Sequence, residues 1–318
     1  MRAAGTPVLR AAVPGAGSRG GLGPFPSVGE VVRELEQLLA RAGIETARLE
    51  AELLVGDVLG FDRGRVYVLW SSPCPPEAAA AARELAVRRS SRLPLQYLRG
   101  VQEFFSRPFL VTPSVLIPRP ETEVLVSRAL ELAGPPHEPR RVLDACTGSG
   151  CIAVTWVKER PSDEVWATDL SPAALLVARE NARRHSVRPH LVACDLLAAF
   201  RPSFRFDLVV SNPPYLPESM RTSLAPEVAL HEPLAALFSG PDGLDVIRRL
   251  VEQSVRLLHP GGVLCLEMGP EQAGAIRGLA ESAGFEQIVV HDDLADRPRV
   301  LTARRLAVRP QGIASKET

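Results

Sequence analysis

Seven short segments rich in apolar and β-branched residues recur along the C-terminal two thirds of the chain, and longer segments with helical periodicity separate them. The expected strands are Val142–Asp144, Val165–Asp169, Leu191–Cys194, Leu208–Ser211, Val263–Glu267, Ile288–His291 and Val300–Ala303. The expected helices are Ile152–Glu159, Pro172–Arg184, Leu244–Leu258 and Glu271–Ala283. This alternation predicts an α/β fold with a mostly parallel sheet, helices on both faces, and a ligand at the carboxyl ends of the strands.

A different pattern precedes this alternation. Ser27 and Glu30 have the spacing of a capping box and are followed by apolar residues at helical spacing. Two further helices are expected, one from about 46 to 59 and one from about 75 to 92. Residues 27–93 therefore predict a small helical domain.

Three further segments complete the predicted organisation. Aromatic and β-branched residues on either side of Gly100 predict that residues 94–118 form a β-hairpin linker before the α/β domain at 119–305. Residues 306–318 are expected to be a flexible tail. The chain has no acidic residue before Glu30 but carries several arginines there, so we expect residues 1–26 to be a mitochondrial presequence and the protein to act in the matrix. A disordered, Gly/Pro-rich tail is the alternative.

Composition excludes several classes of protein. The chain has 318 residues with zero formal net charge, 46% hydrophobic and 23% charged residues, which is typical of a soluble globular protein without a membrane span. Zero net charge supplies no global field that would attract nucleic acid. The five cysteines form neither a C-x-x-C pair nor a zinc-like spacing with histidine, so we expect reduced thiols and no metal site.

The first expected strand of the sheet ends in a turn of small residues. Gly148 and Gly150 allow the backbone to approach a ligand, and the following helix presents free N–H groups. Asp169 ends the next strand, where a carboxylate can accept hydrogen bonds from ribose hydroxyls. Together they predict a nucleoside-containing cofactor. Because Gly148-x-Gly150-x-x-Ala153 also fits the dinucleotide pattern, an NAD enzyme and a turn without ligand remain alternatives.

A second motif follows the fourth expected strand of the sheet, where the chain reads Asn212-Pro213-Pro214-Tyr215. The two prolines fix φ, so the Asn212 side-chain oxygen and the Pro213 carbonyl can be held rigidly as two acceptors. Such a pair suits a planar NH₂ group, against whose flat face Tyr215 can pack. Accepting both hydrogens would direct the nitrogen lone pair toward an electrophile. A Pro-Pro loop beside a core tyrosine is the structural alternative.

These motifs resemble those of class I methyltransferases that use S-adenosylmethionine, and more narrowly those of the HemK/PrmC family. The narrower resemblance rests on Pro94-Leu95-Gln96-Tyr97-Leu98-x-Gly100, Glu103-Phe104-Phe105, Ile117-Pro118-Arg119-Pro120-Glu121-Thr122-Glu123, the N-P-P-Y motif and Glu232-Pro233. It covers about residues 27–305. It implies a Rossmann-like seven-stranded sheet with an N-terminal helical domain, and methylation of the side-chain amide of glutamine in the Gly-Gly-Gln motif of a class I peptide release factor, here a mitochondrial one. S-adenosylhomocysteine would be the product.

The resemblance also implies roles for individual residues. Asn212 to Tyr215 would hold the substrate glutamine, with Asn212, Pro213 and Tyr215 as the catalytic residues. The cofactor would be bound by Asp144, Cys146, Thr147, Gly148, Ser149, Gly150, Asp169, Asp195, Leu196 and Asn212. Cys146 departs from the family, because many members carry glycine at this position. A cysteine is tolerable there only if its φ is negative, so we expect a negative φ at Cys146.

The sequence leaves some roles and two further activities open. Arg119, Glu121 and Glu123 could border the site or could interact with a helix dipole, and Glu267 could lie at the edge of the site or be a solvated strand end. A nucleic-acid methyltransferase acting on adenine N6 or guanine N2 is the rival enzyme, because N-P-P-Y suits those amines too. A non-catalytic binding module with this fold is the other rival. The preferred function implies a protein partner that the helical domain at 27–93 and the hairpin would recognise, with no metal, membrane or nucleic acid required.

Overall fold

The computed structural model describes residues 25–135 and 137–306. The expected presequence, apart from its last two residues, and the expected tail, apart from Leu306, lie outside these ranges. The chain divides into two compact units. The helical unit runs to Gly100 and includes Pro226–His231, and the sheet unit contains Val101–Ala225 and the chain from Glu232 onward.

The helical unit is built around one apolar core, to which its first four helices contribute buried side chains. Its helices are α1 (Val28–Arg41), α2 (Ala47–Leu59), α3 (Arg63–Val68), α4 (Pro76–Ser90), α5 (Leu95–Arg99) and α9 (Pro226–His231). The predicted capping box is confirmed, because the Ser27 hydroxyl accepts from the Glu30 backbone N–H and the Glu30 carboxylate accepts from the Ser27 N–H. Among the described residues, no helix has both the length and the apolar character of a membrane span.

Helix α9 belongs to the helical unit although it lies far along the chain, and the sequence patterns did not predict it. Its Glu227 accepts hydrogen bonds from Arg89 and from Arg92, each at 3.0 Å. Arg89 also forms a buried ion pair with Glu50 at 2.5 Å. This six-residue helix buries no residue, so ion pairs rather than a hydrophobic face bind it to the helical unit.

The sheet unit has the strand order β5-β4-β3-β6-β7-β9-β8, in which β9 runs antiparallel to both of its neighbours, β7 and β8, and the other pairs are parallel. Each of the seven predicted strands is present within a few residues of its expected bounds. The strands are β3 (Arg141–Ala145), β4 (Glu164–Asp169), β5 (His190–Ala193), β6 (Phe206–Ser211), β7 (Leu258–Glu267), β8 (Phe285–Asp292) and β9 (Pro298–Arg305). The order reverses between β3 and β6, which places the topological switch point between these two strands.

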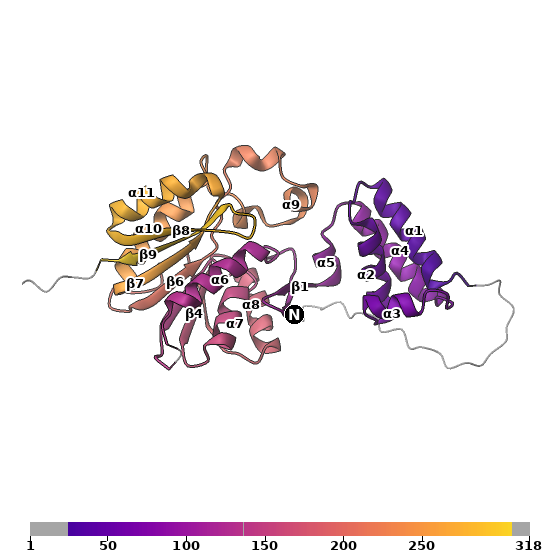
Figure 1. Cartoon of the computed structure of the whole chain (residues 1–318), viewed down its shortest axis with the longest axis horizontal. Helices are drawn as coiled ribbons and strands as arrows, with labels where there is room; N and C mark the ends of the chain where they lie inside the picture. Colours follow the sequence, from indigo (N-terminus) through magenta and orange to yellow (C-terminus); the bar gives the residue numbers. More distant parts are fainter. Residues whose placement is uncertain (1–24, 136, 307–318) are drawn as a thin grey trace, which may run out of the picture. The chain divides into compact units, whose positions relative to one another are not determined.

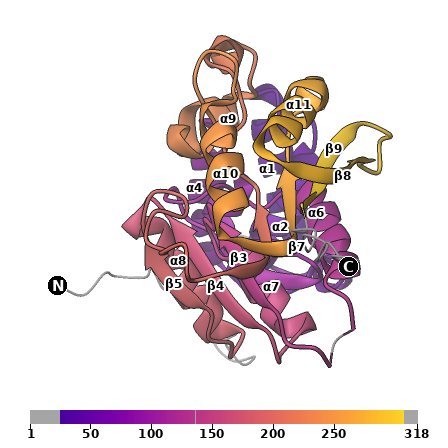
Figure 2. The same ribbon diagram turned by 90° about the vertical axis from the view of Figure 1, so that its left-hand side faces the viewer.

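Helices cover both faces of this sheet, as the alternation predicted. Figures 1 and 2 show α10 and α11 on one side of the sheet and α6 and α7 on the other. The helices are α6 (Pro120–Leu132), α7 (Cys151–Glu159), α8 (Pro172–Arg184), α10 (Asp245–Leu257) and α11 (Ala273–Ala283), with short 3₁₀ turns η1 (Glu218–Thr222), η2 (Leu234–Ala236) and η3 (Pro270–Gln272). Alternate residues of β6 enter opposite cores: Leu208 and Val210 pack on one face and Val209 on the other.

The hairpin expected in the linker is shorter than predicted. Strands β1 (Val101–Phe104) and β2 (Arg107–Leu110) pair in antiparallel fashion, and α5 occupies the start of the expected segment. Phe104 and Phe109 are buried in the core of the sheet unit. The hairpin therefore anchors to the sheet unit through its two buried phenylalanines.

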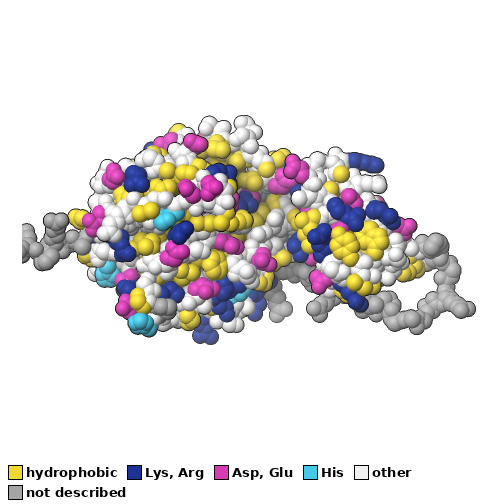
Figure 3. Space-filling view, viewed as in Figure 1, with side chains coloured by type: hydrophobic (Ala, Val, Ile, Leu, Met, Phe, Trp, Pro, Cys, Tyr) yellow, Lys and Arg dark blue, Asp and Glu magenta, His cyan; other side chains and the backbone are white. Residues whose placement is uncertain are grey.

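The surface reflects the balanced composition. Figure 3 shows acidic and basic side chains interspersed over the visible faces of both units. Many of them form ion pairs, for example Arg183 with Glu180 and Arg256 with Glu252. Interspersed charge of both signs gives no long-range field of one sign on these faces.

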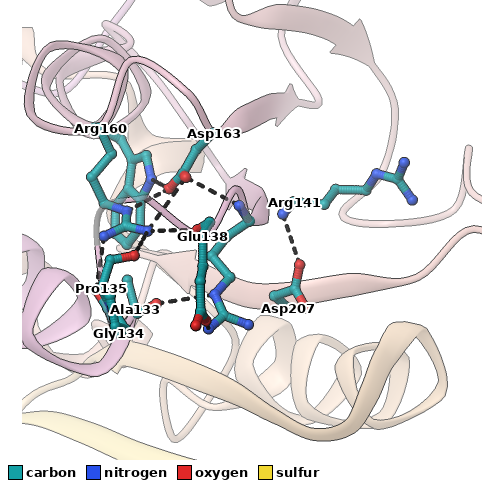
Figure 4. A network of polar contacts seen from close by, with 10 residues as sticks. Ala133, Gly134, Pro135, Glu138, Arg141, Arg160, Asp163 and Asp207 are labelled. Carbon is teal, nitrogen blue, oxygen red and sulfur yellow. Dashed lines mark hydrogen bonds and ion pairs between the residues drawn. The ribbon is translucent and has the colours of Figure 1, made fainter.

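A buried polar network holds the described residues between α6 and β3. The Asp163 carboxylate accepts from Arg160 at 2.6 Å, from the Trp156 indole N–H at 2.8 Å and from the Arg140 backbone N–H at 3.1 Å. Arg160 also donates to the carbonyls of Gly134, Pro135 and Glu138, so that its guanidinium lies among the loop carbonyls in Figure 4. The network holds the start of β3, at the opposite end of the strand from the small-residue turn.

Candidate active site

The turn after β3 is held by a buried carboxylate. Asp144 accepts from the Thr147 hydroxyl at 2.5 Å and from the Ala153 backbone N–H at 3.1 Å. Complete burial raises the pKa of Asp144 to about 7. Asp144 does not line the cavity described below, so its contacts shape the turn from behind rather than reaching a ligand.

The two glycines of the turn have different tasks. Both have positive φ, at +54° for Gly148 and +79° for Gly150. Gly150 caps the N-terminus of α7, and a Cβ on it would lie 3.0 Å from the Cβ of Ala178 in α8. Glycine at this position therefore allows α7 and α8 to approach each other. A Cβ on Gly148 would meet no protein atom within 4 Å, and Gly148 lines the cavity, so glycine keeps that space for a ligand.

Cys146 corrects one expectation. Its φ is +60°, in the left-handed region, and not negative as we expected from the presence of a side chain. The turn therefore keeps the backbone path that suits glycine and carries the cost of a Cβ there. Burial raises the pKa of the Cys146 thiol well above its usual range, with nearby Asp169 adding to the shift, so the thiol is protonated at neutral pH.

A cavity of about 340 Å³ opens at the carboxyl ends of the strands of the sheet unit. Its polar wall comes from the turn and from the residues after β4 and β5. Predicted residues that line it are Cys146, Thr147, Gly148, Ser149, Asp169, Asp195, Leu196, Asn212 and Pro214. Asp144, Gly150, Pro213 and Tyr215 were also predicted for the site, but they do not line this cavity.

Two carboxylates face the cavity from neighbouring strand ends. Asp169 accepts from the Gly148 N–H and from the Ser171 N–H, each at 2.8 Å, which fixes its direction. Burial raises the pKa of Asp169 above its usual value. Asp195 forms an ion pair with Arg249 of α10, and both of these side chains are about half exposed.

The Asn212-Pro213-Pro214-Tyr215 segment leaves β6 directly beside the turn. Ala145 pairs with Ser211 across β3 and β6, and the Ser211 hydroxyl donates to the Ala145 carbonyl at 2.7 Å. The two motifs that were recognised separately in the sequence therefore meet at the switch point of the sheet. Asn212 and Pro214 reach the cavity wall, and Tyr215 turns its hydroxyl toward Glu267 at 3.3 Å.

Glu267 is not a solvated strand end. Its side chain is buried at the end of β7, and it accepts from the Thr122 hydroxyl at 2.7 Å as well as from Tyr215. Thr122 in turn accepts from the Asn212 side-chain amide at 2.9 Å. Burial raises the pKa of Glu267 to about 7.

The other residues left open by the sequence lie outside the cavity wall. Arg119 forms an ion pair with the buried Glu232 at 2.5 Å, and Glu232 also accepts from the Ile117 N–H. Glu123 accepts from the Phe105 N–H at 2.7 Å. Arg119 and Glu123 therefore hold local backbone and loop geometry, and the loop that Glu232 anchors contributes Pro233 to the cavity.

Sequence reasoning missed several residues of the site. Leu170 is 70% exposed and lines the cavity directly after Asp169. Its position in the sequence could have identified Leu170, because an apolar residue directly after the acidic residue that ends a strand can pack against the flat base of a nucleoside. Arg249 and Val246 line the cavity from α10, and Thr122 does so from α6. No local motif marks Arg249 or Val246, and Thr122 stands in the quoted 117–123 motif without a role assigned to it, because contacts between distant segments bring these residues to the site.

The strand order, the glycine turn at the switch point and the neighbouring Asn-Pro-Pro-Tyr segment define a class I methyltransferase. Residues 30–100 match the family model described as the PrmC N-terminal domain, and residues 121–242 match the methyltransferase small domain. The chain is 45% identical to a release factor glutamine methyltransferase of Geobacter sulfurreducens, over 84% of this chain and 92% of that protein. A protein of the same name from Moorella thermoacetica is 43% identical, over 88% of this chain and 97% of that protein. The chain belongs to the HemK/PrmC family of release factor glutamine methyltransferases, and its resemblance to this family is thereby confirmed.

The cavity fits the cofactor of this family, S-adenosylmethionine. Gly148 leaves room for a ligand against the backbone, and the fixed carboxylate of Asp169 can accept from ribose hydroxyls. Leu170 and Leu196, which line the same cavity as Asp195, supply apolar surface for the adenine of the cofactor. Acidic residues in the wall also suit the positive charge of a sulfonium.

Proposed function

We propose that this protein transfers a methyl group from S-adenosylmethionine to the side-chain amide nitrogen of the glutamine in the Gly-Gly-Gln motif of a class I peptide release factor. The relatives named above are release factor glutamine methyltransferases. The observation that carries the proposal is the orientation of Asn212. Its Nδ2 group donates to Thr122, which leaves Oδ1 as an acceptor beside the cofactor cavity.

The chemistry of the site is alignment and polarisation. S-adenosylmethionine, when bound, supplies an electrophilic methyl carbon on a positively charged sulfur. An amide nitrogen is a weak nucleophile because its lone pair is conjugated with the carbonyl. If Asn212 Oδ1 and the Pro213 carbonyl accept the two hydrogens of the substrate amide, its nitrogen is held in one orientation. The lone pair of this nitrogen is then less conjugated with the carbonyl and points toward the methyl donor. Tyr215 would pack against the flat amide.

Neither a metal nor a general base is required in this scheme. The sulfonium is already an active methyl donor, and the methylated amide nitrogen can lose its proton after transfer. S-adenosylhomocysteine is the other product. The apolar part of the cavity wall, including Val115, Pro214 and Pro233, would limit the access of water to the donor.

The proposed partner is a protein rather than a nucleic acid. Acidic and basic residues balance at 37 each, and both signs are interspersed on the faces seen in Figure 3. A nucleic-acid methyltransferase would need a basic groove with aromatic side chains for a flipped base. No membrane contact is part of the proposal.

We also propose that the protein acts in the mitochondrial matrix. The support is the sequence alone: no acidic residue precedes Glu30, and Arg2, Arg10 and Arg19 are spread through the segment. The release factor would then be a mitochondrial one. A fluorescent fusion of residues 1–29 that stays outside mitochondria would refute this part, without touching the proposed reaction.

The test of the reaction is a competition between substrates. The pure protein is incubated with methyl-labelled S-adenosylmethionine and either a release factor or total RNA, and the factor's peptides are then analysed by mass spectrometry. We expect label in the release factor, with one added methyl group on the glutamine of Gly-Gly-Gln. A factor with this glutamine changed to alanine is the control and should stay unlabelled. Label in RNA alone would overturn the proposal in favour of the nucleic-acid alternative.

A further inference from the structure

A chain of hydrogen bonds connects the buried end of β7 to the asparagine that follows β6. Asn212 Nδ2 donates to Thr122 Oγ1 at 2.9 Å, and Thr122 Oγ1 donates to Glu267 Oε2 at 2.7 Å. Tyr215 donates to the other carboxylate oxygen of Glu267 at 3.3 Å. We call these four side chains the relay. They come from three separate segments: α6, the end of β6 with the loop after it, and the end of β7.

The relay has one direction when Glu267 is ionised. A carboxylate can only accept, so the single proton of the Thr122 hydroxyl must point at Glu267. The Thr122 oxygen can then only accept from Asn212. A side-chain amide has a donor end and an acceptor end, so this contact turns the NH₂ of Asn212 toward Thr122 and its Oδ1 away from it. The acceptor end is the one that the proposed reaction needs.

We infer that Thr122 and Glu267 are positioning residues that set the direction of the Asn212 amide, so that Asn212 Oδ1 accepts from the amide of the substrate. The inference rests on the function proposed above. Neither residue needs to touch the reacting atoms. Without the relay, the amide of Asn212 loses the contact that distinguishes its two orientations, and the site must align this acceptor during each reaction cycle.

The surroundings of Glu267 make the relay sensitive to protons. Burial raises its pKa to about 7, and the negative charge of Glu121 in α6 acts in the same direction. The positive charge of Arg299 in β9 and the hydrogen bonds from Thr122 and Tyr215 oppose this shift. A protonated Glu267 can donate to Thr122, which lets the hydroxyl of Thr122 donate to Asn212 Oδ1 and reverses the amide.

A purely structural role of Thr122 and Glu267 would produce the same hydrogen bonds in the structure. In such a role Thr122, which lies in the first turn of α6, would serve only to attach this helix to β7. The two roles differ in what they change. Fastening affects stability, whereas positioning acts through Asn212 and affects turnover at saturating cofactor.

The experiment combines isosteric variants with a double-mutant cycle. Thr122→Val removes both hydrogen bonds of the hydroxyl, and Thr122→Ser keeps the hydroxyl. Thr155→Val in α7 is the matched control, because Thr155 is equally buried and its hydroxyl has no hydrogen-bond partner among the described residues. For each variant, kcat on the release factor, the Kd for S-adenosylmethionine and the melting temperature are measured.

We expect Thr122→Val to lower kcat about tenfold or more, the scale of one preorganised hydrogen bond, with the Kd for the cofactor changed less than about threefold. Thr122→Ser should recover most of kcat, and Thr155→Val should match the wild type. In an Asn212→Ala background, Thr122→Val should lower kcat no further, because the residue through which it acts is gone. Additive losses, or a kcat of Thr122→Val equal to that of the control, would overturn the inference.

The pH profile gives an independent result that does not depend on the folding of a threonine variant. The kcat of the wild type should fall as the pH is lowered through about 7, and this limb should be absent in Glu267→Gln, which cannot titrate. A limb that persists in Glu267→Gln would contradict the role of Glu267. Failure of the wild type to label the release factor at any pH would instead refute the proposed function.

Discussion

The network at the start of β3 allows a stability prediction that is separate from catalysis. Asp163→Asn is nearly isosteric, so it removes charge without opening a cavity. It leaves Arg160, whose side chain is 4% exposed, without its charge partner. In Asp163, Oδ2 accepts from Trp156 and Arg160 and Oδ1 accepts from the Arg140 backbone N–H, so an NH₂ group in either position faces at least one donor.

The magnitude follows from the cost of an unpaired buried charge. Removing one partner of a buried ion pair costs about 3–5 kcal/mol. A domain of this size loses about 2–4 °C of melting temperature per kcal/mol, so we expect a fall of about 6–20 °C. Differential scanning calorimetry measures this directly. Methyl transfer well below the transition should be unchanged, because the network lies at the opposite end of β3 from the cofactor turn.

Glu252→Gln is the control for this experiment. It breaks an ion pair with Arg256 in which both side chains are more than 60% exposed, so it should shift the melting temperature by about 2 °C or less. The reasoning about burial would be refuted if Asp163→Asn lowered the melting temperature no more than this control.

Three further predictions concern the site. Asn212→Ala should cut kcat by about 100-fold or more while the Kd for S-adenosylmethionine, measured by calorimetry, stays nearly unchanged; unchanged turnover would refute its role. Cys146→Gly should melt at the same temperature as the wild type or up to about 3 °C higher, because glycine removes the cost of a Cβ at φ +60°, and a clear fall would contradict the strain argument. Asp144 binds its proton more tightly when folded, with a pKa of about 7, so between about pH 4 and 7 it makes the folded state less stable as the pH rises. The slope of melting temperature against pH should therefore be more positive over this range in Asp144→Asn than in the wild type, and equal slopes would argue against the raised pKa.

The sequence predicted those parts of the fold that local patterns determine. Alternating apolar segments located all seven strands of the sheet, and the Ser27–Glu30 capping box located the start of α1. Gly148 and Asn212 could be identified because each belongs to a motif whose spacing has its own chemical meaning. Their proximity followed from the rule that ligands bind at the switch point of a parallel sheet.

The remaining features depend on contacts between distant parts of the chain. Helix α9 buries no residue, and ion pairs to Arg89 and Arg92 bind it. Glu267 resembled a solvated strand end because its partner Thr122 is 145 residues away in the sequence. The φ of Cys146 was predicted with the wrong sign because the turn tolerates the cost of a Cβ, and no sequence pattern reports that balance.

The central claim is that the Asn212–Tyr215 segment grips a planar amide in front of the methyl donor. The most direct test is a crystal structure with S-adenosylhomocysteine and a release factor that carries the Gly-Gly-Gln motif. We predict that the glutamine side-chain nitrogen lies within hydrogen-bond distance of Asn212 Oδ1 and of the Pro213 carbonyl, and faces the cofactor sulfur. A glutamine bound elsewhere, or a segment turned away from the sulfur, would contradict the account.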